Sequence, residues 1–267
     1  EAREITVSSE AMGKIIEFNI EDGKLISAGE RVGLIDTTEL SLNRTQLLAR
    51  KKAVLSKLDN ISKQIMVYEQ QKDNLLVDKK RVENLLKDGA ATKKQLDDIE
   101  GGIKVVDRRI SAVKSQRQGI LDESNAIDAQ IAQINEKIDK CSIINPVKGT
   151  VLTKYAEESE ITTFGKPLYK IADLSAMELK VYVSGAQLPN IKLGDNVEVL
   201  IDKDKKTNTK LSGVISWISS SAEFTPKTIQ TKEERVNLVY AVKVRVTNDG
   251  SLKIGMPGEV NFQNVDN

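Results

Sequence analysis

Apolar residues recur at every seventh position along two long stretches, which together run from about residue 39 to residue 141. The first series is Leu47, Val54, Ile61, Tyr68, Leu75 and Val82, and the second is Ile99, Val106, Val113, Ile120, Ile127, Ile134 and Cys141. A sustained heptad pattern is typical of coiled-coil helices. Because only a short turn separates the two series, they predict an antiparallel hairpin of two helices. At about 1.5 Å per residue, arms of roughly 48 residues each span about 70 Å.

Polar residues interrupt the seam between the two arms. The positions four residues after the first series include Lys51, Lys72 and Lys79. Their aliphatic stems can pack in the seam while their ammonium groups reach water, and they are candidates for contacts with neighbouring hairpins. In the return arm Arg117 and Ser124 take seam positions, which predicts either local looseness or a stutter in the heptad pattern in the middle of that seam.

Capping residues mark the helix ends. Asp36 or Thr37 can cap the first helix, and Gly89 predicts where the outgoing arm stops. Thr92 and Gln95 have the spacing of a capping box, in which each side chain bonds to the backbone of the other residue. The sequence therefore places the tip of the hairpin at about residues 87–92.

Residues 1–38 and 142–173 read as short strands and turns, and the two segments repeat each other. A shift of 136 residues aligns Gly13 with Gly149, Ile15 with Val151, Ile16 with Leu152, Gly29 with Gly165, Val32 with Leu168 and Ile35 with Ile171. Two copies of one unit predict a single β module. The hairpin is then an insertion into that module, and its two ends must lie close together.

Residues 174–267 predict a separate antiparallel β region. Alternating apolar residues indicate strands at 178–183, 196–201, 210–219, 237–246 and 259–262, with a helical turn within 186–193. Strands without long helices favour a small β-barrel. Trp217 lies in an alternating strand, where we expect core packing rather than stacking on a ligand. Residues 203–206 predict a solvated turn, and residues 222–235 a polar loop that is mobile or forms a contact surface.

The amino-acid composition excludes several kinds of catalytic and metal-binding site. The chain has no histidine, one cysteine and a net charge of +1. The absence of histidine excludes Ser-His and Cys-His catalysis and nearly excludes zinc sites, and the low net charge gives no bias towards nucleic acid. We expect Cys141 to be a buried small hydrophobe. No apolar run reaches the length of about 18 residues that a membrane-spanning helix needs. No catalytic, cofactor or metal site is predicted.

The order of these parts resembles the membrane fusion proteins, or periplasmic adaptor subunits, of bacterial tripartite efflux and type I-like secretion systems (the HlyD-like secretion protein family). The resemblance covers essentially the whole chain and is carried by residues 13–15, 29–32, 145–151 and 255–260. It implies an α+β multidomain fold. A split lipoyl-like β domain (residues 1–38 plus 142–173) holds a coiled-coil α-hairpin (39–141), and a small antiparallel β-barrel (174–267) follows.

One motif suggests what the hairpin binds. Family members that dock onto a TolC-like outer-membrane channel carry Arg, Leu four residues on, and Ser seven further, at the hairpin tip. Arg81, Leu85 and Thr92 keep this spacing, with Thr in place of Ser. The alternative is local: Arg81 is a solvated charge, Leu85 lies near the end of a seam and Thr92 caps a helix. For Thr92 both roles are compatible, if its oxygen accepts from the backbone and its proton is donated outward.

The resemblance implies a non-catalytic periplasmic adaptor without cofactor, anchored to the inner membrane by an N-terminal segment absent from this chain. Six copies would form a tube that links an inner-membrane exporter to the channel. Because the chain stops soon after Val260, the resemblance favours an ABC-type exporter over a proton-driven pump. Two alternatives remain. A coiled-coil spacer unrelated to export leaves the repeat unexplained, and a lipoyl-type carrier needs a lysine at the turn that the hairpin replaces.

Overall fold

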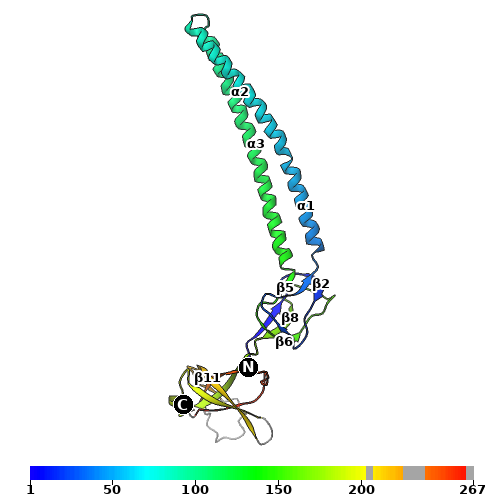
Figure 1. Cartoon of the computed structure of the whole chain (residues 1–267), viewed down its shortest axis with the longest axis vertical. Helices are drawn as coiled ribbons and strands as arrows, with labels where there is room; N and C mark the ends of the chain where they lie inside the picture. The colour runs from blue at the N-terminus through cyan, green and yellow to red at the C-terminus, as the bar shows by residue number, and fades with distance from the viewer. Residues whose placement is uncertain (203–206, 225–237, 263–267) are drawn as a thin grey trace. The chain divides into compact units, whose positions relative to one another are not determined.

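The structure is a computed structural model that describes residues 1–202, 207–224 and 238–262 (Figure 1). The chain divides into two compact units. One unit is formed by residues 36–141, and the other combines residues 1–35 with residues 142–267. A continuous segment thus forms one unit while the chain on its two sides meets in the other.

The first unit is a helical hairpin. Its helices are Thr38–Leu55 (α1), Lys57–Lys87 (α2) and Lys93–Asp139 (α3), and α1 and α2 run antiparallel to α3 (Figure 1). Three close ion pairs between the arms share one register: Lys51–Asp128, Lys72–Asp107 and Lys79–Glu100, at 2.7, 2.7 and 2.8 Å. The two residue numbers of each pair add to the same total, so a single register holds along the hairpin.

The outgoing arm is two helices, and the single helix expected from the heptad series is wrong. α1 ends at Leu55 and α2 begins at Lys57. At the junction the Ser56 hydroxyl donates to the carbonyl oxygen of Ala53 at 2.8 Å. A serine that bonds back to the preceding turn competes with the helical hydrogen bonds and bends the helix.

Most of the buried side chains of the hairpin lie on α3. They are Val106, Ile110, Val113, Ser124, Ile127 and Ile134. Val54 is buried in α1, whereas α2 buries no residue. Cys141, at 1% exposure, is the buried small residue that the sequence predicted. The two-helix hairpin therefore buries only a narrow apolar seam, and the residues that α2 adds to this seam are less buried than those of α3.

Eight strands on the two sides of the hairpin form what we call the split β module. They are Glu4–Ser8 (β1), Gly13–Phe18 (β2), Leu25–Ile26 (β3), Arg31–Ile35 (β4), Ser142–Ile144 (β5), Gly149–Lys154 (β6), Ile161–Thr162 (β7) and Pro167–Ala172 (β8). One sheet has the order β1-β8-β6-β3 and the other β5-β4-β2-β7. Each sheet takes two strands from before the hairpin and two from after it, so neither half can complete a sheet alone.

The sequence repeat is visible strand by strand. A shift of 136 residues carries β2, β3 and β4 onto β6, β7 and β8, and it exchanges the two sheets. Gly29 and Gly165 occupy equivalent turns with φ of 78° and 80°. β4 and β5 pair directly, with Leu34 opposite Ser142. The two ends of the inserted segment therefore lie on neighbouring strands, as expected.

A buried polar contact joins the two halves of the split β module. Asn145, fully buried, donates from Nδ2 to the carbonyl oxygens of Ser27 at 2.8 Å and Val147 at 2.6 Å. Its Oδ1 accepts from the Tyr169 hydroxyl at 3.0 Å. Burial, with a smaller contribution from the Glu30 carboxylate, raises the pKa of Tyr169 to about 12. Every polar atom of the Asn145 amide is thus satisfied without water.

The remaining strands form one antiparallel sheet. They are Ala176–Ser184 (β9), Asn196–Asp202 (β10), Asn208–Ile218 (β11), Glu223–Phe224 (β12), Leu238–Thr247 (β13) and Glu259–Asn261 (β14), with a 3-10 turn at Leu188–Asn190 (η1). The order is β12-β13-β11-β10-β14, and β9 pairs with β13. Its inner face is aliphatic, with Ile215, Val242 and Val244 among the most buried residues. The five predicted strands and the helical turn are all present.

Trp217 does not pack in this core, and that expectation is wrong. Its exposure is 43%, whereas Ile215 two residues earlier is 2% exposed. The pairing of β11 with β13 shifts register between Ile215 and Trp217. Such a bulge inserts an extra residue and reverses the inward and outward alternation beyond it. The turn at 203–206 lies outside the described residues, as does the predicted polar loop after Phe224.

Candidate docking site at the hairpin tip

The turn at the tip has the geometry of a Schellman motif. Gly89 has φ of 72°, a left-handed conformation that favours glycine. The amide of Ala90 donates to the carbonyl oxygen of Leu85 at 2.7 Å, and the amide of Gly89 donates to that of Leu86 at 3.2 Å. These two bonds satisfy carbonyl groups that the end of α2 would otherwise leave unpaired. The helix stop predicted at Gly89 is confirmed.

Thr92 begins the return arm through a complete capping box. Its Oγ accepts from the Gln95 amide at 3.3 Å, and the Gln95 Oε1 accepts from the Thr92 amide at 2.8 Å. The predicted capping box is therefore confirmed. The Thr92 hydroxyl also donates to the Gln95 Oε1 at 3.1 Å. In this structure the hydroxyl therefore bonds within the capping box, and a part for Thr92 in docking stays a prediction.

Asp36 caps the other end of the outgoing arm. Its Oδ1 accepts from the amide of Thr38 at 2.9 Å and from the Thr38 hydroxyl at 2.6 Å. Thr37 occupies the N-cap position without a side-chain capping bond. Of the two candidates from the sequence, Asp36 is the residue whose side chain bonds the first turn.

Arg81 and Leu85 are exposed one helical turn apart on α2. Residues four apart lie on one helix face, so the two present a cation and an apolar group side by side. Arg81, 68% exposed, pairs with Asp78 at 3.1 Å. Leu85 is 41% exposed, and the half-buried seam position is Leu86. Leu85 lies next to the end of the seam, as suggested, but outside it, and its side chain is exposed.

The lysines of the outgoing arm are used within the hairpin. Lys72 and Lys79 reach across to Asp107 and Glu100. The hydrogen bond that Lys72 donates to Asp107 raises the pKa of Lys72, and the one that Lys79 donates to Glu100 likewise raises the pKa of Lys79. We expected these ammonium groups to reach water or neighbouring hairpins. Their cross-arm partners could have been found by pairing the two heptad series in antiparallel register.

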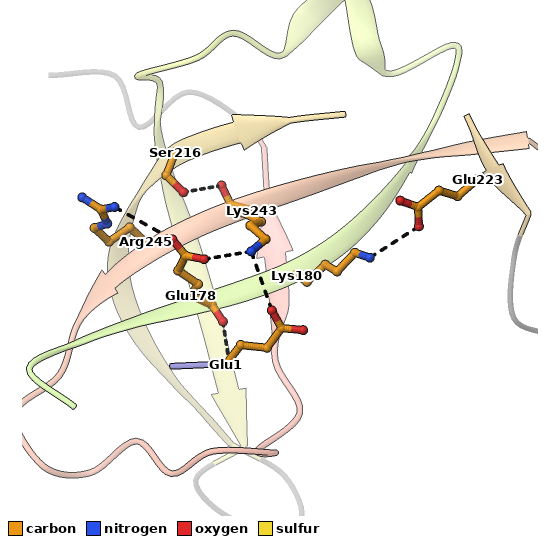
Figure 2. A network of polar contacts seen from close by, with 7 residues as sticks. All are labelled: Glu1, Glu178, Lys180, Ser216, Glu223, Lys243 and Arg245. Atoms are coloured by element: carbon orange, nitrogen blue, oxygen red, sulfur yellow. Dashed lines mark hydrogen bonds and ion pairs between the residues drawn. The ribbon is translucent and has the colours of Figure 1, made fainter. Parts of the chain in front are cut away.

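A polar network lies on β9, β11, β12 and β13 in the other unit (Figure 2). Lys243 faces Lys180 directly across the β9–β13 pair, and like charges in that position repel. Glu178 lies 3.1 Å from Lys243 and 3.9 Å from Arg245, and Glu223 lies 3.4 Å from Lys180 (Figure 2). Each cation thus has an acidic neighbour, and the network stabilises the sheet without offering a reactive group.

The residues that the structure describes offer few other groups suited to metal binding or catalysis. Among them no group of histidine, cysteine, aspartate and glutamate side chains is arranged to hold a metal ion. Burial raises the pKa of the Cys141 thiol, and the Asp36 carboxylate adds to this effect. Within the same residues no helix has the length and apolar character needed to cross a bilayer.

No protein-family model matches the chain. It is similar to a UPF0194 membrane protein of Yersinia pseudotuberculosis serotype O:3 (strain YPIII), with 34% identity over 121 residues, which are 45% of this chain and 36% of that protein. A UPF0194 membrane protein of Yersinia enterocolitica matches at 33% over 122 residues, 45% of this chain and 37% of that protein. The match thus covers little more than a third of these curated relatives.

Solved structures resemble the chain over nearly all of its length. The membrane fusion protein Spr0693 of Streptococcus pneumoniae R6 has a TM-score of 0.56 at 16% identity, covering 98% of this chain and 95% of that one. MacA of Actinobacillus actinomycetemcomitans has a TM-score of 0.54 at 20% identity, covering 97% and 78%. A MacA–MexA chimera with the Pseudomonas aeruginosa MexA alpha-hairpin domain scores 0.55 at 20% identity, covering 97% and 75%. The predicted resemblance to membrane fusion proteins is confirmed at the level of the fold.

Proposed function

We propose that this chain, which has the fold of membrane fusion proteins, is a non-catalytic periplasmic adaptor that links an inner-membrane exporter to a TolC-like outer-membrane channel. The observation that carries the proposal is the hairpin tip. It presents Arg81 and Leu85 on one exposed face beside a turn that two backbone hydrogen bonds hold in place. Exposed side chains on a rigid turn suit docking because little conformational entropy is lost on binding.

The split β module supports a lipoyl-like assignment without carrier activity. A lipoyl-type carrier presents a lysine at the turn between its two halves. In this chain that connection is the whole hairpin, which leaves β4 after Ile35 and returns at Ser142. We therefore assign the module a structural role, with the β9–β14 sheet as the small barrel that follows it.

The narrower features of the proposal rest on resemblance. We propose an ABC-type exporter, assembly of six copies, and anchoring to the inner membrane through an N-terminal segment. The lysines at 51, 72 and 79 already pair across their own hairpin. Lateral contacts between copies must therefore use other side chains, such as the exposed Met66 and Val77 of α2.

The direct test is binding to a purified TolC-like channel, measured by size exclusion with light scattering, with and without the exporter. The Arg81→Asp/Leu85→Ser variant should lose binding. A matched control, Leu48→Ser/Arg50→Asp, changes the same residue types on the same arm away from the tip, and Leu48 is 49% exposed. The control should bind like wild type. No binding by the wild-type chain under any of these conditions would contradict the proposal.

A further inference from the structure

The hairpin lacks strong cross-arm bridges in its middle. Lys51 pairs with Asp128 on one side of this region, and Lys72 pairs with Asp107 on the other. Between them lie about 30 Å of helix. In this hairpin, every residue of which is described, the one ion pair joining the arms over that length is Lys114–Glu69, at 3.9 Å. Two segments of the hairpin with short cross-arm ion pairs thus flank a segment whose arms are joined by one longer ion pair.

The outgoing arm passes from α1 to α2 in the same region, where Ser56 keeps helical dihedrals (φ −61°, ψ −22°) and its amide still donates to the carbonyl oxygen of Lys52 at 3.0 Å. The Ser56 hydroxyl also bonds back to Ala53. The register of the cross-arm ion pairs sets Ser56 opposite Glu123, beside Ser124. Ser124 is 4% exposed, in a seam whose other buried members on α3 are valine or isoleucine. A small polar side chain thus replaces a large apolar one at the level of the junction between α1 and α2.

One seam position at this level is not filled by an apolar side chain. Arg117 takes the next seam position after Ile110 but is exposed. A pocket opens there, lined by Ser62, Ile65, Lys114, Arg117 and Gln118. Val113 is buried and Ile65 partly buried at this level, but Arg117 adds no apolar side chain to the seam.

Gly119 adds a fourth feature, on the return arm. A Cβ at this position would meet no heavy atom within 4 Å, so packing does not require a glycine there. At Gly102 a Cβ would lie 3.7 Å from the Leu75 side chain, which is an ordinary van der Waals contact, so packing does not require a glycine there either. A glycine inside a helix increases the freedom of the backbone. Gly119 therefore increases the backbone freedom of α3 at the level of the junction between α1 and α2.

We propose that residues 56–68 and 114–124 form a bending joint within the hairpin. The segment with Lys51–Asp128 and the segment with Lys72–Asp107 and Lys79–Glu100 move as stiffer bodies about it. The α1–α2 junction, the buried Ser124, the exposed seam residue Arg117 and the unrequired Gly119 coincide there, and cross-arm ion pairs bound it on both sides. The inference does not rest on the adaptor function.

Hydrogen exchange of the full chain tests the joint. Amides of residues 56–68 and 114–124 should exchange faster than those of both flanking segments. The Arg117→Leu/Gly119→Ala variant should slow exchange in the joint by about fivefold, since it fills the seam and removes the glycine. Gly101→Ala is the matched control, because a Cβ there also meets nothing within 4 Å, and it should leave the joint unchanged. Exchange that rises steadily towards the tip, or slows equally in both variants, would overturn the proposal.

Spin labels separate bending from local fraying. In a Cys141→Ala background, labels at Lys104 and Gln133 lie on exposed positions of α3 on either side of the joint, about 44 Å apart along a straight helix. The distance distribution should be broad and should narrow in the Arg117→Leu/Gly119→Ala variant. A distribution that is already narrow in the wild-type chain, or equally broad in both, would contradict a joint.

Discussion

Thr92 has a local role that is fully satisfied inside the chain. Its hydroxyl both accepts from the Gln95 amide and donates to the Gln95 side chain. Thr92→Ala should therefore lower the free energy of unfolding by about 1 kcal/mol, the usual cost of losing an N-cap. Thr92→Ser should restore it, because the serine hydroxyl can make the same bonds. Chemical denaturation measures both variants. Equal stability of Thr92→Ala and wild type would show that the capping box contributes nothing.

Tyr169 gives the split β module a dependence on alkaline pH. Its pKa of about 12, raised chiefly by burial, exceeds the value near 10 of an unfolded tyrosine. The folded state therefore holds the phenol proton more tightly, and this stabilisation is complete below about pH 10 and lost as pH rises towards 12. Urea unfolding from pH 8 to 11 should show a steeper loss for wild type than for Tyr169→Phe. Parallel curves would contradict the assignment.

Single residues were predicted where a short local pattern determines them. Thr92 with Gln95, Gly89 and Cys141 follow from capping, turn and heptad rules, and the structure confirms them. Trp217 was missed because a β-bulge reverses the side chains that follow it. Such a bulge depends on the pairing with β13, far along the chain, and no local pattern reveals it.

At the scale of elements, the cross-arm ion pairs set the register of the hairpin. The Asp107 hydrogen bond raises the pKa of Lys72, so the pair stabilises the charged lysine. Lys72→Glu should lower the melting temperature, and the reversed pair Lys72→Glu/Asp107→Lys should recover most of the loss. Lys63→Glu is a suitable control, since Lys63 pairs with Asp59 of its own helix and not across the arms. A reversed pair as unstable as the single variant would argue against this register.

Gly33 permits the close pairing of β4 with β2. A Cβ there would lie 2.7 Å from the Glu17 carbonyl oxygen and 2.9 Å from the Phe18 ring, too close for either to relax. Gly33→Ala should cost about 1–3 kcal/mol of unfolding free energy. Gly23→Ala is not a suitable control, because Gly23 has open space around it but a φ of 82° that strains any other residue. Gly119→Ala is the better control, because Gly119 is helical and also has open space around it. Denaturant midpoints compare the two. A Gly33→Ala chain as stable as wild type would contradict the packing described.

At the scale of the whole molecule, the hairpin is an insertion. β4 and β5 pair with Leu34 opposite Ser142, so a short turn can replace residues 36–141. The chain without the hairpin should fold and unfold cooperatively, because both sheets keep all of their strands. Circular dichroism during thermal unfolding measures this. Loss of the β signal on removing the hairpin would mean that the hairpin is required for the module to fold.

The overall architecture was predictable because it is determined by sequence patterns that extend over many residues. Two heptad series and a repeat at 136 residues each extend over many positions, so single errors such as Trp217 do not alter them. The break at Ser56 was not predictable in this way, since heptad positions continue unchanged through it. The tip partner depends on three positions, Arg81, Leu85 and Thr92. The structure places all three at the surface of the hairpin tip.

Export from living cells tests the central claim most directly. Cells that depend on this chain for export would carry either wild type, Arg81→Asp/Leu85→Ser, or Leu48→Ser/Arg50→Asp. All three should unfold within about 1 kcal/mol of one another, because the changed residues are exposed. The account predicts that the tip variant abolishes export while the control retains it. Normal export by a stable tip variant, or equal loss in the control, would contradict docking through the hairpin tip.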